Sequence, residues 1–301
     1  MAKLVLIYDL KTIKLFKMKT FIQSIFATLV LALSLVSCRN SEENITETPT
    51  ETQSLKLIKE FSNDKHSIEL YSATGQLSQG YHEISIKIKN KATGQYENNA
   101  NVQWLPVMHM TSMSHSCPKS ALSPSVSQPN MYTGYIVFTM AQNASEYWDL
   151  KVDYTINGTQ YTATTVLDVP ATSKRVVTSF KGSDNVKYVM AYIDPKNPKI
   201  ATNDITIGLW KMQDMMNFSV VDGYTVKIDP RMPSMGNHSS PNNIHAVQKN
   251  NGGLYFGKLS LTMSGYWKIN LQLANQEGNI LKGEEISGDT TSSSIYFELE
   301  F

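Results

Sequence analysis

Cysteine is almost absent from the chain, and the little that occurs excludes a disulfide scaffold. Only Cys38 and Cys117 are present. Cys38 directly follows an apolar run near the start of the chain, far from Cys117, and no internal disulfide between the two is expected. Cys117 is then a lone thiol, which is either a ligand or a small buried side chain, and the sequence leaves both alternatives open.

The chain also lacks an excess of charge of either sign. Its 27 basic and 26 acidic residues give a formal net charge of +1. Nothing in this overall charge predicts nucleic acid or an anionic substrate as a partner.

The motifs that identify common enzyme classes are missing as well. The sequence contains no phosphate-binding glycine loop, no His-Glu-x-x-His helix and no nucleophile elbow. Histidines are few, and His66 and His82 are expected to be ordinary surface or strand residues. We therefore expect a protein that is not an enzyme. A Ser-His-Asp triad assembled from distant residues is the remaining enzymatic alternative.

No apolar run is long enough to span a bilayer. The longest extends from Phe21 to Val36, which is shorter than the roughly 20 residues that a spanning helix needs and is typical of a cleaved leader. Lys17 and Lys19 precede it, and Leu35-Val36-Ser37-Cys38 resembles the lipobox of bacterial lipoproteins. This resemblance implies a signal peptide over 1–37 and a mature chain anchored to the membrane by a lipid on Cys38. Met18 opens a leader of ordinary length and is the expected true start.

A polar tether is expected between the lipid and the folded part, over residues 38–54. Within it, Ser41-Glu42-Glu43 resembles the acidic signal that sends some lipoproteins to the cell surface, although a solvated tether explains the same residues. We predict an outer-membrane lipoprotein that faces either the periplasm or the cell surface.

Alternating apolar residues predict an all-β fold. Ile84, Ile86 and Ile88 alternate with polar residues, as half-buried strands do. Asn157-Gly158 is the strongest hairpin turn signal in the chain. Short strands separated by turn signals fit two immunoglobulin-like β-sandwiches in tandem, over 55–171 and 172–301. On the strand that ends at Met140, Tyr135, Val137 and Phe138 are expected to point into the core.

The two halves share an order of landmarks that indicates an internal duplication. Tyr132 to Met140 and Tyr255 to Met263 have the same span, and each pair is followed by a tryptophan, Trp148 or Trp267. The first half has four additional residues before its tryptophan, which predicts a longer loop there.

Each half also carries a methionine-rich loop, and these loops are the part of the sequence that suggests chemistry. Each contains two methionines three residues apart and a histidine shortly after them. Thioether sulfur and imidazole together favour Cu(I) over hard cations, whereas zinc would require more histidine, cysteine or carboxylate. The candidate ligands are Met108, His109, Met110, Met113, His115 and Cys117 in the first loop, and Met232, Met235 and His238 in the second, with His245 as a further donor. The alternative is a structural plug, because methionine also fills gaps in cores.

The second loop carries a resemblance to a known family. Met232-Pro-Ser-Met-Gly-Asn-His238, together with Tyr255 to Met263 and Trp267, resembles the YtkA-like and FixH-like domains over most of residues 185–275. The first loop departs from the pattern, since Thr111 and Ser114 replace the proline and glycine. The resemblance implies extracytoplasmic work with copper and a copper donor or acceptor protein as a partner.

Two functions are therefore expected from the sequence. The first is a lipid-anchored copper-binding protein that holds Cu(I) for storage, tolerance or delivery. The second is a cell-surface binding or adhesion lipoprotein in which the methionine loops are structural. Mutation of the methionines distinguishes the two, because adhesion should survive it.

Overall fold

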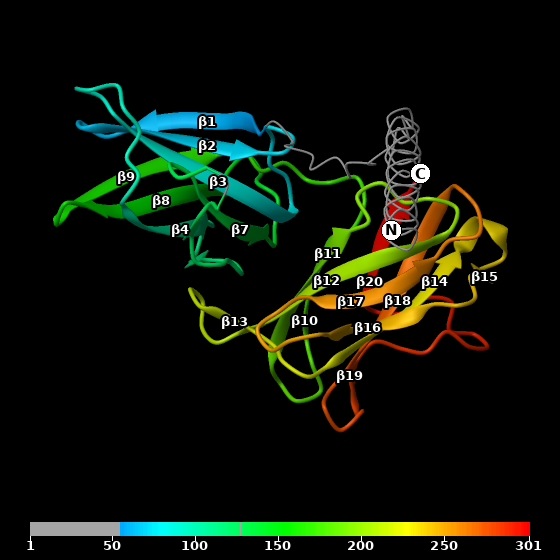
Figure 1. Ribbon diagram of the computed structural model, residues 1–301. Coiled ribbons are helices and arrows are strands. Elements are labelled where there is room, and N and C mark those ends of the chain that lie inside the picture. Colours follow the sequence, from blue (N-terminus) through cyan, green and yellow to red (C-terminus); the bar gives the residue numbers. More distant parts are fainter. Residues whose placement is uncertain (1–54, 127) are drawn as a thin grey trace, which may run out of the picture. The chain divides into compact units, whose positions relative to one another are not determined.

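Antiparallel strands are nearly all of the regular secondary structure in the described part of the chain, which comprises residues 55–126 and 128–301 of the computed structural model (Figure 1). The predicted leader, Cys38 and the tether lie outside the described residues. Within the described ranges, the helical element is a single 3-10 turn, η1 (Pro233–Met235), and no helix there is long and apolar enough to cross a membrane.

The first sandwich is built from two separate sheets. One sheet has the order β1 (Lys56–Ser62), β2 (His66–Ser72), β3 (Gly80–Asn90), β7 (Tyr132–Phe138) and β6 (Ser123–Pro124). The other has the order β5 (Ser114–His115), β4 (Asn101–His109), β8 (Tyr147–Ile156) and β9 (Thr159–Leu167). The alternating isoleucines of β3 are fully buried between these sheets, as predicted.

The predicted hairpin joins β8 to β9. Ile156 pairs with Thr159 across the turn, and the two turn residues have φ values of 49° for Asn157 and 80° for Gly158. Positive φ at both central positions defines the turn type whose twist matches antiparallel strands. The Asn-Gly prediction is confirmed.

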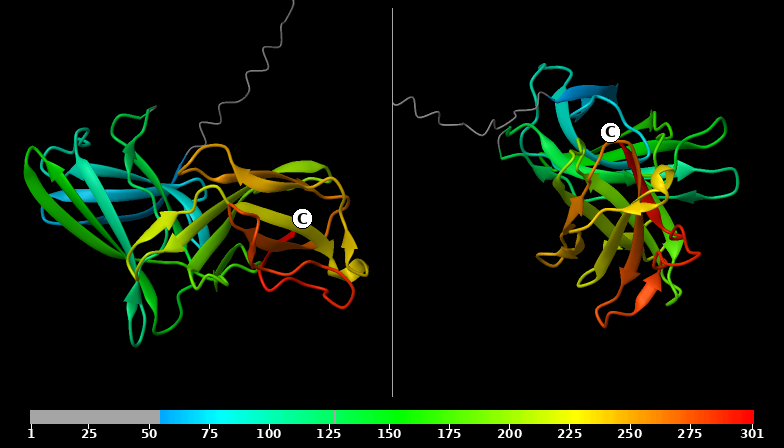
Figure 2. Two further views of the ribbon diagram at one scale, coloured as in Figure 1. Left: turned by 90° about the horizontal axis from the view of Figure 1, so that it is seen from below. Right: turned by 90° about the vertical axis from the view of Figure 1, so that its right-hand side faces the viewer.

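The second sandwich is a single sheet that folds over on itself (Figure 2). Its path runs through β10 (Val177–Lys181), β11 (Lys187–Asp194), β12 (Thr202–Met212), β17 (Tyr255–Ser260), β16 (Ile244–Gln248), β14 (Thr225–Met232), β18 (Tyr266–Ala274) and β19 (Ile280–Lys282). Three further strands pair with it: β13 (Phe218–Val220) with β12, β15 (His238–Ser239) with β14, and β20 (Tyr296–Glu300) with β18. The two layers enclose one apolar core that includes Trp267.

The same tryptophan contact occurs in both sandwiches. Trp148 Nε1 donates a hydrogen bond to the Met140 carbonyl at 2.9 Å, and Trp267 Nε1 donates to the Met263 carbonyl at 3.0 Å. Both tryptophans are fully buried. The landmarks matched in the sequence therefore occupy equivalent positions, and the fold is a tandem of immunoglobulin-like β-sandwiches.

A small apolar cluster joins the two sandwiches. It contains Val137 of β7 and Trp210 of β12, with Val177, Val189 and Ala191 around them. Trp210 Nε1 donates to the Tyr135 hydroxyl at 3.1 Å. The prediction that Tyr135 and Val137 point into the core is wrong, because Ile136 and Phe138 occupy the core side of β7 and alternation turns their neighbours outward.

Candidate functional site

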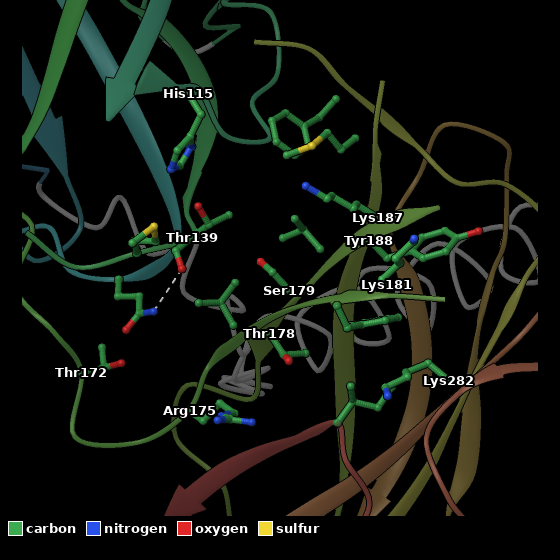
Figure 3. A pocket seen from close by; sticks show the side chains of 18 of the residues that line it. His115, Thr139, Thr172, Arg175, Thr178, Ser179, Lys181, Lys187, Tyr188 and Lys282 are labelled. Atoms are coloured by element: carbon green, nitrogen blue, oxygen red, sulfur yellow. Dashed lines mark hydrogen bonds between the residues drawn. The ribbon is translucent and has the colours of Figure 1, made fainter. Parts of the chain in front are cut away.

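A cleft of about 960 Å³ is lined by both sandwiches (Figure 3). The first sandwich contributes the loop after β4 and the end of β7, and the second contributes β10, the start of β11 and the turn from β12 to β13. The lining includes Met110, Met113, His115 and Met140 from the first sandwich, and Arg175, Ser179, Lys181, Lys187, Met212, Met215, Lys282 and Glu298 from the second.

The first methionine loop forms part of this wall. The Met110 N–H donates to the Met113 carbonyl at 2.9 Å and closes the turn. Met110 is partly buried against the core of the first sandwich, whereas Met113 is 51% exposed. Both methionines line the cleft.

His115 is held so that one ring nitrogen stays available. Its ring packs edge-on against Trp148, with the two ring centroids 5.8 Å apart. Nδ1 lies 2.7 Å from the Ser116 carbonyl oxygen, and because a carbonyl only accepts, Nδ1 carries the proton. In the neutral form of the ring, Nε2 is then the nitrogen with the lone pair, through which an imidazole binds a metal.

Three more methionines line the cleft, and the sequence patterns had not assigned them to a site. Met140 follows β7, Met212 ends β12 and Met215 lies in the following turn. The Ser116 N–H donates to the Met215 carbonyl at 2.8 Å, so the two loops are bonded directly. Met212 and Met215 have the same three-residue spacing as the predicted pairs, and this signal could have identified them.

The other candidates of the first loop do not reach the cleft. Met108 is fully buried in the core. His109, its neighbour on the strand, points to the opposite side, where Nε2 lies 2.8 Å from Asp149 and the ring stacks on Tyr147. Cys117 is also buried in the core, and burial raises the pKa of its thiol. These three residues are removed from the ligand set.

The second methionine loop does not bring its candidates together. Met232 is buried in the core of the second sandwich, whereas Met235 is 57% exposed on η1 and His238 is exposed on β15. His245 accepts a hydrogen bond at Nδ1 from the Ile228 N–H at 3.2 Å. Burial, together with the charge of Lys227, lowers the pKa of His245. Here the structural alternative describes Met232 better than the ligand prediction does.

The opposite wall of the cleft is basic, which the overall charge did not predict. Lys181 of β10 and Lys187 of β11 are direct cross-strand partners, and Lys282 lines the same space (Figure 3). In the described part of the chain, none of the three forms an ion pair. Like charges directly opposite each other on a sheet destabilise it.

One carboxylate lines the cleft with these cations and already accepts hydrogen bonds from other groups. Glu298 accepts hydrogen bonds from the Tyr266 hydroxyl at 2.6 Å and from the Arg175 N–H at 2.8 Å. Burial alone would raise the pKa of Glu298, but these hydrogen bonds and the charges of Arg175 and Lys268 lower it overall. Glu298 therefore remains ionised without neutralising the lysines of the cleft.

The two walls suit different ligands. Thioethers and a neutral imidazole are soft, uncharged donors, whereas lysine ammonium groups donate to carboxylates and phosphates. Among the described residues, no group of three histidine, cysteine, aspartate or glutamate side chains is arranged to hold a metal ion.

Comparisons with known proteins add little to this geometry. No family model and no curated protein matches the chain, so the resemblance to YtkA-like and FixH-like domains stays a prediction. Similar solved structures include the Escherichia coli adhesin FdeC, with 14% identity over 74% of this chain and 64% of the adhesin, at a TM-score of 0.22. A chimeric titin Z1Z2 tandem is 13% identical over 67% of this chain and 88% of that chain, at a TM-score of 0.16. The chain thus spans less than two thirds of the adhesin, and neither likeness carries an argument about function.

Proposed function

We propose that this chain is a lipid-anchored binding protein of the cell envelope that captures an acidic segment of a partner protein in the cleft. The observation that carries the proposal is the group of three lysines, Lys181, Lys187 and Lys282, which line the cleft without ion-pair partners among the described residues. The sequence supports the location, since the predicted lipid on Cys38 would hold the sandwiches outside the cytoplasm.

Electrostatics favour this ligand over a metal cation. Arg175 and the three lysines line the same space, and among the described residues Glu298 is the one carboxylate that lines it with them. A monovalent cation in the cleft would meet charges of its own sign, whereas a carboxylate would relieve the repulsion between Lys181 and Lys187. A binding function also requires no catalytic group.

The test uses a fluorescein-labelled hexaglutamate peptide as the probe. The parent protein should bind it more tightly at low salt than at high salt, because screening weakens exposed charge pairs. Lys181→Gln with Lys187→Gln should weaken binding about tenfold, since two exposed charge pairs contribute roughly 0.7 kcal/mol each. The matched control, Lys65→Gln with Lys199→Gln, removes the same charge from exposed positions outside the cleft.

The control pair distinguishes binding in the cleft from general electrostatic attraction of the peptide to the protein surface. If the control pair weakens binding as much as the cleft pair does, the cleft is not the site. A hexaglutamine peptide that binds as well as hexaglutamate would also overturn the proposal.

A second candidate function is Cu(I) binding at the first methionine loop. The free Nε2 lone pair of His115 and the thioethers of Met110 and Met113 on the same wall favour it. Met212 and Met215 would supply further sulfurs from the second sandwich. The family resemblance supports the same function.

Competition with a chromogenic Cu(I) chelator tests this candidate. Met110→Leu with Met113→Leu nearly conserves volume, so the free energy of unfolding should change by less than about 1.5 kcal/mol while Cu(I) binding is lost. Met235→Leu is the matched control, because Met235 is as exposed as Met113 but does not line the cleft. Unchanged Cu(I) binding in the double variant would leave the methionines as apolar lining of the cleft.

A further inference from the structure

The hydrogen-bonding direction of β10 can be assigned residue by residue. Beyond one end of the strand, the Tyr192 N–H donates to the Val176 carbonyl at 2.8 Å. Beyond the other end, the Gly182 N–H donates to the Val186 carbonyl at 2.9 Å. Because bonded positions alternate in an antiparallel ladder, the even-numbered residues of β10 bond to β11. The N–H and C=O groups of Val177, Ser179 and Lys181 therefore point away from β11.

This outer edge is paired at its two ends and open between them. At one end the Glu298 N–H donates to the Arg175 carbonyl at 2.9 Å, and at the other the Ser183 N–H donates to the Leu281 carbonyl at 2.8 Å. Between these two bonds, no described residue forms a hydrogen bond with the outward backbone groups of β10. The open stretch, Val177 to Lys181, lies along the cleft (Figure 3).

The side chains beside this open edge differ on its two faces. Lys181 points to the same face as its cross-strand partner Lys187. Val177 is on that face too and belongs to the cluster that joins the sandwiches. Phe180 lies on the other face and packs against the core of the second sandwich. A strand beside β10 would therefore meet cations on one face and an apolar surface on the other.

We infer that β10 takes up an extended segment of a partner protein, with alternating acidic and apolar residues, as an added antiparallel β-strand. This inference rests on the proposed function and specifies how the acidic segment is bound. The backbone of the segment would pair with Val177, Ser179 and Lys181, and its acidic side chains would face Lys181 and Lys187. Five residues of strand span about 17 Å, which fixes the length of segment that the open edge accepts.

The experiment compares three forms of one peptide, fluorescein-labelled Glu-Val-Glu-Val-Glu-amide. In the inferred register the glutamate N–H groups point toward β10 and the valine N–H groups point away. N-methylation of the glutamates should weaken binding at least about tenfold, because it removes the donors of the ladder. N-methylation of the valines is the matched control, since it adds the same methyl groups on the side that faces away, and it should change affinity less than about threefold.

Amide hydrogen exchange provides a second readout that requires no variant of the protein. In the free protein, the amides of Val177, Ser179 and Lys181 should exchange rapidly, whereas those of Thr178 and Phe180 should be protected by β11. Addition of the unmodified peptide should protect the three outward amides.

The outcomes distinguish the inference from the proposed function. If both N-methylated peptides bind alike and the outward amides stay unprotected, while Lys181→Gln with Lys187→Gln still weakens binding, strand addition is wrong and capture by charge alone stands. If the unmodified peptide does not bind, both are wrong. Concentration-dependent dimerisation that protects the same amides without peptide would make a second copy of the chain the occupant and overturn the inference.

Discussion

Replacement of Trp210 should uncouple the two sandwiches, because its indole is the largest side chain in the cluster that joins them. A tryptophan buries roughly 200 Å², which at about 25 cal/mol per Å² corresponds to ~5 kcal/mol before relaxation. Observed costs of truncating a buried tryptophan are about 3 to 5 kcal/mol. Loss of the hydrogen bond to Tyr135 contributes about 1 kcal/mol of this. Trp210→Ala should therefore lower the free energy of unfolding by about 3 kcal/mol or more.

Urea denaturation followed by circular dichroism measures this effect, and Gly208 supplies an internal control. A Cβ atom on Gly208 would overlap the ring of Trp210, whose atoms are its three nearest neighbours. Gly208→Ala alone should cost about 1 to 3 kcal/mol, because the indole must move. In the Trp210→Ala background the same change should be nearly neutral. If Gly208→Ala lowers the free energy of unfolding equally in both backgrounds, this account of the cluster that joins the sandwiches is refuted.

Three further predictions concern other parts of the fold. Burial, the largest cause, lowers the pKa of His82 from 6.5 to about 4. As the pH falls, the unfolded chain therefore takes up a proton on His82 before the folded chain does. Stability should fall by up to about 3 kcal/mol as the pH drops from about 6.5 to 4, and His82→Gln should flatten that slope in urea titrations. The Cys117 thiol is buried, and burial raises its pKa. It should therefore resist maleimide at pH 8 until urea unfolds the protein, which mass spectrometry would show. Labelling of the native protein would contradict the placement of Cys117 in the core. Gly158→Ala should lower stability by about 1 to 2 kcal/mol in thermal melts, because the residue has a φ of 80°.

The fold could be read from local sequence patterns because each pattern acts over a few residues. The isoleucine alternation of β3 and the Asn157-Gly158 turn depend only on strand periodicity and turn geometry. Which face of β7 pointed inward could not be read in the same way. Both faces of that strand carry bulky apolar residues, since the outer face packs against Trp210.

The candidate site was predictable only where its residues are neighbours in the sequence. Met110, Met113 and His115 form one loop and were identified together. Lys187 and Lys282 are far apart in the chain and meet only through the second sandwich. A net charge of +1 averages over such distances and conceals a basic wall. The same averaging explains why no anionic partner was expected.

The two hydrogen bonds that close the outer edge of β10 also limit what the edge can do to the protein itself. A long unpaired edge is a template on which identical chains can stack into fibres. Here Arg175 is paired with Glu298 and Ser183 with Leu281, so the unpaired part of the edge ends after a few residues on each side. The open stretch between these two bonds, Val177 to Lys181, is no longer than β10 itself. The unpaired backbone of β10 is thus too short to act as the long template that such stacking needs.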